Sequence, residues 1–189
     1  MNVTAVLLAG GESRRMGRDK ATLLFRGKPL WRIQLDLLRK LESTEIFVSA
    51  RTDPVWRPAG VQFAADDPPS RGPLSGLAAS LARMCTEHLL ALAIDTPFMT
   101  EKYLKFLCDQ VEPGCGVIAK IDDRFEPLAA IYPREALANV QRALSGTDFS
   151  LQTMAGCLAT AGKLGVIAVT PQEKKLFLNL NELADLAAL

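Results

Sequence analysis

The stretch at residues 8–20 has the sequence L-A-G-G-E-S-R-R-M-G-R-D-K and directly follows the apolar segment 3–7. A short apolar run in this position predicts a buried strand. After it, Gly10 and Gly11 allow positive φ and close approach of the backbone, so peptide N–H groups can point at an anion. Positive charge in the same stretch comes from Arg14, Arg15, Arg18 and Lys20. The pattern predicts a phosphate-binding loop after a strand, and therefore a protein that holds a nucleotide.

The spacing within this loop disfavours two common nucleotide-binding folds. A Walker loop requires G-x-x-x-x-G-K-[ST], whereas here five residues separate Gly11 from Gly17 and Lys20 is followed by Ala21. The dinucleotide fingerprint G-x-G-x-x-G also fails, because Gly10 and Gly11 are adjacent. We therefore expect neither a P-loop NTPase nor a Rossmann dehydrogenase. A glycine pair after a strand can also be an ordinary turn, but the four cations favour phosphate binding.

The composition indicates one ordinary globular domain. The chain has 189 residues, of which 49% are hydrophobic and 23% charged, and its formal net charge is +1. This length can bury a sizeable core without disulfides or metals, so we expect a single domain over residues 1–189. The near-neutral charge gives no indication of nucleic-acid binding.

Targeting and metal-binding signals are sparse. No apolar run approaches the length of about 18 residues that suggests a membrane span, and residues 1–8 do not resemble a signal peptide. We therefore expect a cytoplasmic protein that uses no membrane. No cysteine pair has zinc-site spacing, and buried free thiols are expected at Cys85, Cys108, Cys115 and Cys157.

Short apolar runs alternate with amphipathic patterns along the whole chain. Strands are predicted at residues 3–8, 46–49, 61–64, 89–94, 117–120, 128–132 and 166–169. Helices are predicted at residues 30–41, 74–85, 101–111, 134–144 and 182–189. This alternation predicts an α/β fold with a Rossmann-like, mostly parallel sheet flanked by helices. In such sheets ligands bind at the carboxyl ends of the strands.

Carboxylates follow two of the predicted strands. Asp66 and Asp67 follow the strand at 61–64, and Asp95 follows the strand at 89–94 in the sequence I-D-T-P. Mg²⁺ takes oxygen ligands and is usually shared with substrate phosphates, so Asp95 is the candidate metal ligand. The alternative is a turn residue before Pro97 that caps a helix. For Asp66 and Asp67, a turn before the two following prolines is an equal alternative.

The loop sequence resembles the nucleotidyltransferase superfamily, and specifically the molybdenum cofactor guanylyltransferases (MobA-like proteins). Further stretches are similar to family motifs in family order: F-R-G-K-P-L at 25–30, G-P-L-S-G at 72–76, I-D-T-P at 94–97, E-P-L-A-A-I-Y at 126–132 and N-L-N-E-L-A-D-L at 179–186. The form R-R-M-G-x-D-K, with G-P-L-x-G and the late N-x-N, is fairly specific. The resemblance covers most of the chain and implies the nucleotide-diphospho-sugar transferase type of fold.

The resemblance also implies roles for individual residues. Lys20 would bind phosphate, Asp95 would hold Mg²⁺, and both would act in catalysis together with Arg15. Asn179 and Asn181 match the asparagines near the reacting phosphates. The implied nucleotide contacts, with guanine and ribose at the first three, are Leu8, Ala9, Gly10, Gly11, Lys20, Asp66, Gly76 and Asp95.

Two positions leave the carry-over open. Asp67 is an alternative to Asp66, because the following loop is one residue shorter than in related proteins. Ser49 stands where related enzymes have an asparagine, which removes one implied nucleotide contact.

The implied reaction transfers GMP from GTP to the terminal phosphate of molybdopterin and releases pyrophosphate. Such a transfer needs positioning and charge neutralisation more than a general base. Two alternatives stay open: a related transferase that uses CTP or a sugar phosphate, and a non-catalytic nucleotide-binding partner of molybdoenzyme maturation proteins. The presence of both Lys20 and Asp95 favours an enzyme.

Overall fold

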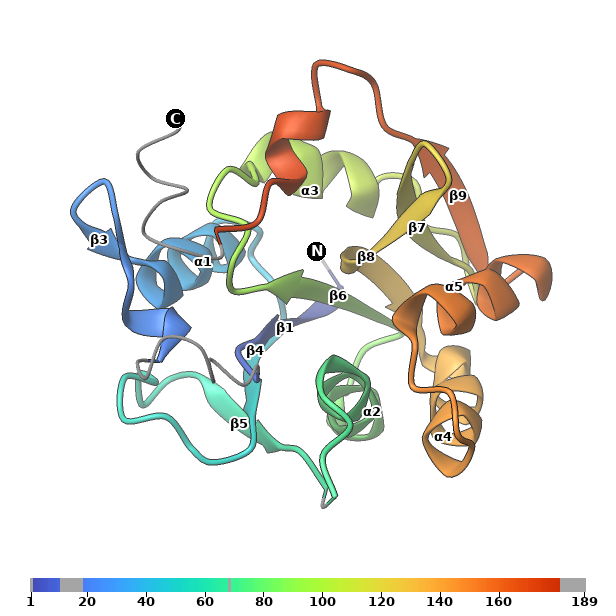
Figure 1. Cartoon of the computed structure of the whole chain (residues 1–189), viewed down its shortest axis with the longest axis horizontal. Helices are drawn as coiled ribbons and strands as arrows, with labels where there is room; N and C mark the ends of the chain where they lie inside the picture. The colour runs from blue at the N-terminus through green and yellow to red at the C-terminus, as the bar shows by residue number, and fades with distance from the viewer. Residues whose placement is uncertain (1, 11–18, 68, 181–189) are drawn as a thin grey trace.

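The computed structural model describes residues 2–10, 19–67 and 69–180, and these form a seven-stranded sheet with helices on both faces (Figure 1). The strand order is β5-β4-β1-β6-β8-β7-β9. The bounds are β1 Val3–Leu8, β4 Glu45–Ala50, β5 Gln62–Ala65, β6 His88–Ala93, β7 Gly116–Ile121, β8 Arg124–Pro133 and β9 Leu164–Ala168. All seven predicted strands are therefore present in the sheet.

The helices form one layer on each face of the sheet. One core cluster packs the sheet against α1 (Leu30–Arg39) and α3 (Glu101–Cys108), as Figure 1 shows on one side of the strands. A second cluster packs the other face against α2 (Pro73–Arg83), α4 (Leu137–Ser145) and α5 (Leu151–Thr160). The predicted helix at 182–189 lies outside the described residues. Both faces of the central strands are buried, which explains their continuous apolar sequences.

Six of the strands are parallel and one is reversed. β1 pairs in parallel with β4 and β6, β4 with β5, and β7 with β9, whereas β8 runs antiparallel to both of its neighbours. The reversal follows from the short link between β7 and β8, where only Asp122 and Asp123 separate the strands. A parallel crossover needs a dozen or more residues, so two residues can close only a hairpin. The mostly parallel sheet is thus confirmed.

Two strands and one α-helix of the structure were not predicted from the sequence. β2 (Leu24–Phe25) and β3 (Lys28–Pro29) form a hairpin whose turn residues Arg26 and Gly27 have φ of 51° and 77°. Two positive φ values are typical of a type I′ turn. The third element is α5, where the Ser150 side chain caps the first turn by accepting a hydrogen bond from the N–H of Thr153 at 3.4 Å.

Two smaller expectations have different outcomes. In the described part of the chain, no helix is long and apolar enough to cross a membrane. The expectation of buried cysteines is wrong for Cys85 and Cys157, which are exposed, whereas Cys108 is buried. Burial raises the pKa of the Cys108 thiol to about 12.

Candidate functional site

The carboxyl ends of β1, β4, β5 and β6 meet at one edge of the sheet. Leu8, the last residue of β1, pairs with Ser49 on one side and with Ala93 on the other. The chain segments that leave these strands carry Gly10 after β1, Asp66 after β5 and Asp95 after β6. Three predicted site residues therefore lie at the ligand-binding edge that is expected for an α/β sheet.

Lys20 and Asp95 are in direct contact. The Lys20 Nζ donates to Asp95 Oδ2 at 2.7 Å, and the two side chains are 22% and 21% exposed. The first turn of α3 is capped instead by Thr100, whose hydroxyl accepts from the N–H of Tyr103. The alternative role of Asp95 as a helix cap is therefore not supported. The structure joins two residues that were predicted separately and that lie 75 positions apart in the sequence.

The residue before Lys20 fixes the local backbone. Asp19 is the N-cap of the short 3₁₀ helix η1 (Lys20–Thr22), and its Oδ1 accepts from the N–H of Ala21 at 3.0 Å. Its other oxygen, Oδ2, accepts from the indole Nε1 of Trp56 at 2.8 Å. No sequence pattern pointed to Trp56, because the contact joins loops that lie 37 positions apart.

Asp66 is a buried carboxylate held by two hydroxyls. It is 7% exposed, and its Oδ1 and Oδ2 accept from Ser49 Oγ at 2.9 Å and from Ser70 Oγ at 2.8 Å. A Cβ built on Gly10 would lie 3.5 Å from Asp66 Oδ2. Asp66 therefore lies beside the backbone of the N-terminal loop. Ser49 acts on this carboxylate, which gives a physical role to the residue that departs from the related enzymes.

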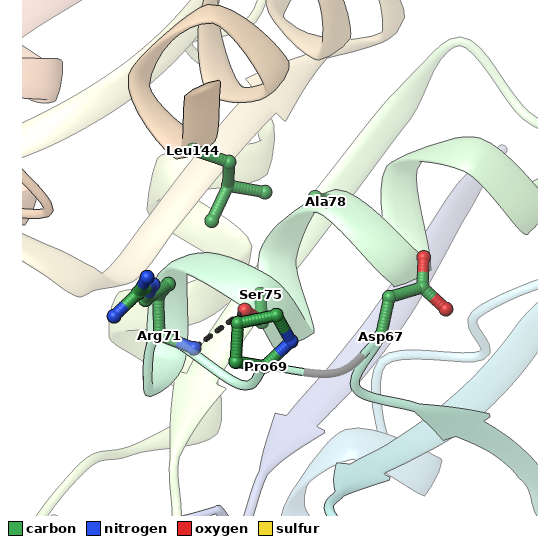
Figure 2. A pocket seen from close by; sticks show the side chains of 6 residues that line it. All are labelled: Asp67, Pro69, Arg71, Ser75, Ala78 and Leu144. Atoms are coloured by element: carbon green, nitrogen blue, oxygen red, sulfur yellow. Dashed lines mark hydrogen bonds between the residues drawn. The ribbon is translucent and has the colours of Figure 1, made fainter. Parts of the chain in front are cut away.

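Asp67 points elsewhere. Asp67 lines a pocket of about 280 Å³, and Figure 2 shows Asp67 and Arg71 on opposite sides of it. The pocket is lined by Asp67, Pro69, Arg71, Ser75, Ala78 and Leu144. The Arg71 guanidinium also stacks over the ring of Phe149, 4.4 Å from its centroid. Asp66 thus lies beside the N-terminal loop and Asp67 does not, and a nucleotide contact of either carboxylate stays a prediction.

Leu8, Ala9 and Gly10 differ in whether their backbone groups form hydrogen bonds with other described residues. The Leu8 carbonyl accepts from the N–H of Ile94 at 3.2 Å, and the N–H of Ala9 donates to the Ser49 carbonyl at 2.9 Å. The Gly10 backbone makes no hydrogen bond with the rest of the described chain. Its φ is not positive, so the backbone freedom that glycine allows is not used there. A Cβ at Gly10 would make only ordinary contacts, with Asp66 Oδ2 at 3.5 Å and with the Ala50 Cα at 3.7 Å.

Gly76 permits close packing between α2 and the strand ends. A Cβ at this buried position would lie 2.4 Å from Ser49 Oγ and 2.7 Å from Leu8 Cδ2. Real Cβ atoms do not approach so closely, so only glycine fits without a shift of Ser49 or Leu8. This packing role was not predicted, and a nucleotide contact of Gly76 stays a prediction.

The last described residues, 178–180, reach the same edge of the sheet. The N–H of Leu180 donates to the Asp95 carbonyl at 2.7 Å, which places the exposed residue Asn179 next to the Asp95 position. Figure 1 shows this segment running from η3 (Lys174–Phe177) toward the end of β6. The other predicted site residues, Gly11, Arg15 and Asn181, lie outside the described residues.

Comparison with known proteins identifies the family. Residues 5–159 match the family described as the MobA-like NTP transferase domain. The chain belongs to the MobA-like NTP transferase family.

A curated relative agrees with this assignment, and a solved structure shares the fold. The chain is 34% identical over 186 residues to a protein of Opitutus terrae named "Probable molybdenum cofactor guanylyltransferase", a match covering 97% of this chain and 92% of that protein. The crystal structure of molybdopterin-guanine dinucleotide biosynthesis protein A from Archaeoglobus fulgidus superposes with a TM-score of 0.79 at 24% identity, covering 98% of this chain and 95% of that one.

The fold extends to transferases with other substrates. The 2-C-methyl-D-erythritol 4-phosphate cytidylyltransferase of Thermus thermophilus superposes with a TM-score of 0.70, covering 100% of this chain and 96% of that one. Its sequence identity is only 14%, so this likeness shows the fold alone. The shared scaffold does not select a base, which depends on the residues at the strand ends.

A divalent cation fits this MobA-like site. No group of three or more His, Cys, Asp or Glu side chains that could hold a metal occurs among the residues the structure describes. Mg²⁺ does not require one, because it is commonly bound through one or two carboxylates plus substrate phosphates and water. The Asp95 carboxylate is partly exposed and already holds a cation, the Lys20 ammonium. Asp95 can therefore serve as the protein's ligand for a metal shared with a nucleotide.

Proposed function

We propose that this MobA-like protein transfers GMP from GTP to the terminal phosphate of molybdopterin and releases pyrophosphate. The observation that carries the proposal is the Lys20–Asp95 pair, with Nζ and Oδ2 2.7 Å apart, at the edge that also bears Gly10 and Asp66. An ammonium that can bind a phosphate and a carboxylate that can bind a metal thus lie together at the carboxyl edge of the sheet. The names of the relatives supply the substrate class.

The reaction requires little acid–base catalysis from the protein. An oxygen of the acceptor phosphate forms a bond to the α-phosphorus of GTP. The bond from that phosphorus to the oxygen bridging to the β-phosphate breaks, and pyrophosphate leaves with the electron pair. Because the attacking oxygen is already anionic, in-line positioning and neutralisation of charge supply most of the catalysis.

Each described residue has a definite task in this scheme. Lys20 binds a phosphate oxygen of the nucleotide, and its ammonium leaves Asp95 for that oxygen. Asp95 would hold Mg²⁺, and the metal would neutralise negative charge on the phosphates. Gly10 lets the nucleoside approach the backbone beside Asp66, whose carboxylate is kept in place by Ser49 and Ser70. Asn179 contributes from the acceptor side.

The experiment compares nucleotides and follows the product. Thermal unfolding is measured with GTP, CTP, ATP and UTP in the presence of Mg²⁺, because a ligand that binds the native state raises the unfolding temperature. Pyrophosphate release is then measured with molybdopterin as the acceptor. We expect the largest shift and the only rapid release with GTP. A preference for CTP would indicate the related cytidylyltransferase activity, and binding without release would indicate a non-catalytic nucleotide-binding protein.

A further inference from the structure

The Asp19 carboxylate connects two loops, because it contacts Trp56, which lies 37 positions further along the sequence. One oxygen caps η1 by accepting from Ala21 N–H at 3.0 Å, and the other accepts from Trp56 Nε1 at 2.8 Å. The residue that follows Asp19 is Lys20, which points at Asp95. The indole N–H of Trp56 therefore contacts the residue directly before Lys20, whose ammonium is assigned to the phosphate.

Trp56 is itself held in a defined orientation. Its ring stacks on the ring of Trp31 from α1, with centroids 5.6 Å apart and an interplanar angle of 16°. The surrounding loop is closed by Arg57, whose Nε and Nη2 donate to the two oxygens of Asp53, each at 2.6 Å. Arg57 Nη1 also donates to the Val61 carbonyl. These contacts place an indole donor at Asp19 from a loop that is otherwise largely exposed.

We propose that Trp56 is a positioning residue for Lys20, acting through Asp19. The inference rests on the proposed function, in which Lys20 binds the nucleotide phosphates. Lysine has a long flexible side chain, so a fixed starting backbone reduces the number of conformations that must be lost when the phosphate binds. The indole hydrogen bond holds the Asp19 carboxylate where it caps η1, and the cap sets the direction in which Lys20 leaves the backbone.

The hydrogen bond and the ring packing can be separated experimentally. Trp56→Phe keeps an aromatic ring against Trp31 but removes the Nε1 donor. Trp31→Phe is the matched control, since it makes the same change on the other side of the stack and leaves the Trp56–Asp19 bond intact. Asp19→Asn is a second test, because asparagine caps a helix as well as aspartate but its amide nitrogen cannot accept from the indole.

The readouts are kcat, KM for GTP, the dissociation constant of GTP by calorimetry, and the unfolding temperature. We expect Trp56→Phe and Asp19→Asn each to weaken GTP binding and lower kcat/KM by about tenfold, because Lys20 then has more conformations to lose when it binds the phosphate. Trp31→Phe should change both by less than about twofold, the size expected for a packing change outside the site. Unfolding temperatures of the Trp56 and Trp31 variants should agree closely. Equal losses in these two variants would show that Trp56 only packs, and would overturn the proposal.

A double-mutant cycle with Lys20→Ala tests the route. If Trp56 acts through Lys20, Trp56→Phe should have no further effect on GTP affinity in the Lys20→Ala protein. Additive losses would mean that Trp56 acts elsewhere and would overturn the inference while leaving the proposed function intact. If Lys20→Ala alone binds and turns over GTP normally, the assignment of Lys20 in the proposed function fails, and the positioning role fails with it.

Discussion

The Lys20 ammonium lies 2.7 Å from the Asp95 carboxylate and joins the end of the N-terminal loop to the end of β6. In the free protein the two charges neutralise each other. A nucleotide with its metal would separate them, because the phosphate attracts the ammonium and the metal attracts the carboxylate. The pair is partly exposed, so breaking it costs about 1 kcal/mol or less.

Lys20→Ala should therefore separate folding from activity. We expect the free energy of unfolding to fall by no more than about 1 kcal/mol, since the lost ion pair is partly exposed. Nucleotidyl transfer should fall by about 100-fold or more, because the phosphate loses its cation. Denaturant unfolding and pyrophosphate release measure the two effects. Near-normal turnover would show that the phosphates bind elsewhere.

Asp95→Asn tests the metal ligand. Asparagine keeps the size of the side chain and an acceptor for Lys20, so the unfolding temperature should change little. Transfer should fall by orders of magnitude, because a neutral amide binds Mg²⁺ poorly, and a higher Mg²⁺ concentration should recover part of the loss. The measurement is the initial rate across a Mg²⁺ titration. An unchanged rate with an unchanged Mg²⁺ dependence would exclude Asp95 as the ligand.

Gly76→Ala should disturb the candidate site through the residues that pack against Gly76. The new Cβ would lie 2.4 Å from Ser49 Oγ, so Ser49 has to rotate away from Asp66 or α2 has to shift. Either response costs about 1–3 kcal/mol of stability, as is typical of overpacking. GTP affinity should fall as well, because the Asp66 carboxylate loses one of its two hydroxyl partners.

A second helical glycine provides the control for that substitution. A Cβ at Gly156 in α5 would meet only Phe125 Cε2 at 3.8 Å, an ordinary contact. Gly156→Ala should raise the free energy of unfolding by about 0.5–1 kcal/mol, because alanine favours the helix, and should leave GTP affinity unchanged. Equal effects of the two substitutions would mean that crowding at Ser49 is unimportant.

Glu45→Gln should show a pH-dependent loss of stability. Burial alone would raise the pKa of Glu45, but hydrogen bonds from the Cys85 N–H, the Thr4 hydroxyl and Gln62 outweigh it and lower the pKa below its usual 4.5. A lowered pKa stabilises the folded state above pH 4.5, and this contribution disappears as the pH falls through the folded-state value. At pH 7 the variant should be about 1 kcal/mol less stable than the wild type. Urea unfolding should show the two proteins converging below pH 4.5; a constant difference would contradict the titration.

The sheet was predictable because its central strands are short and largely apolar: Thr4 in β1 and His88 in β6 are their polar residues. The hairpin of β2 and β3 was missed because two-residue strands have no measurable periodicity. α5 was missed because Thr153, Gly156 and Thr160 disfavour a helix locally, and tertiary packing of its apolar face overrides this preference.

The candidate site could be proposed residue by residue but not as a set of contacts. Motif resemblance pointed to Lys20, Asp66 and Asp95 separately, and the fold then brought Lys20 to Asp95. The hydrogen bonds of Trp56 and Ser49 with their aspartates join separate loops and strands, so no local pattern encodes them. They are consequences of strand order, which determines which loops become neighbours.

Because β8 is reversed, the carboxyl edge of the sheet has two kinds of connection: loops that lead into helices and one hairpin turn. After β5 and β6 the edge is built from loops that lead into α2 and α3, so a change of length there moves a helix. Between β7 and β8 the edge is a hairpin tip, Asp122 and Asp123, and Asp122 forms an ion pair with Lys174. Insertions at such a tip leave both strands in register. A longer turn at this tip would therefore reshape this part of the edge without moving a helix, and would leave Lys20, Asp66 and Asp95 where they are.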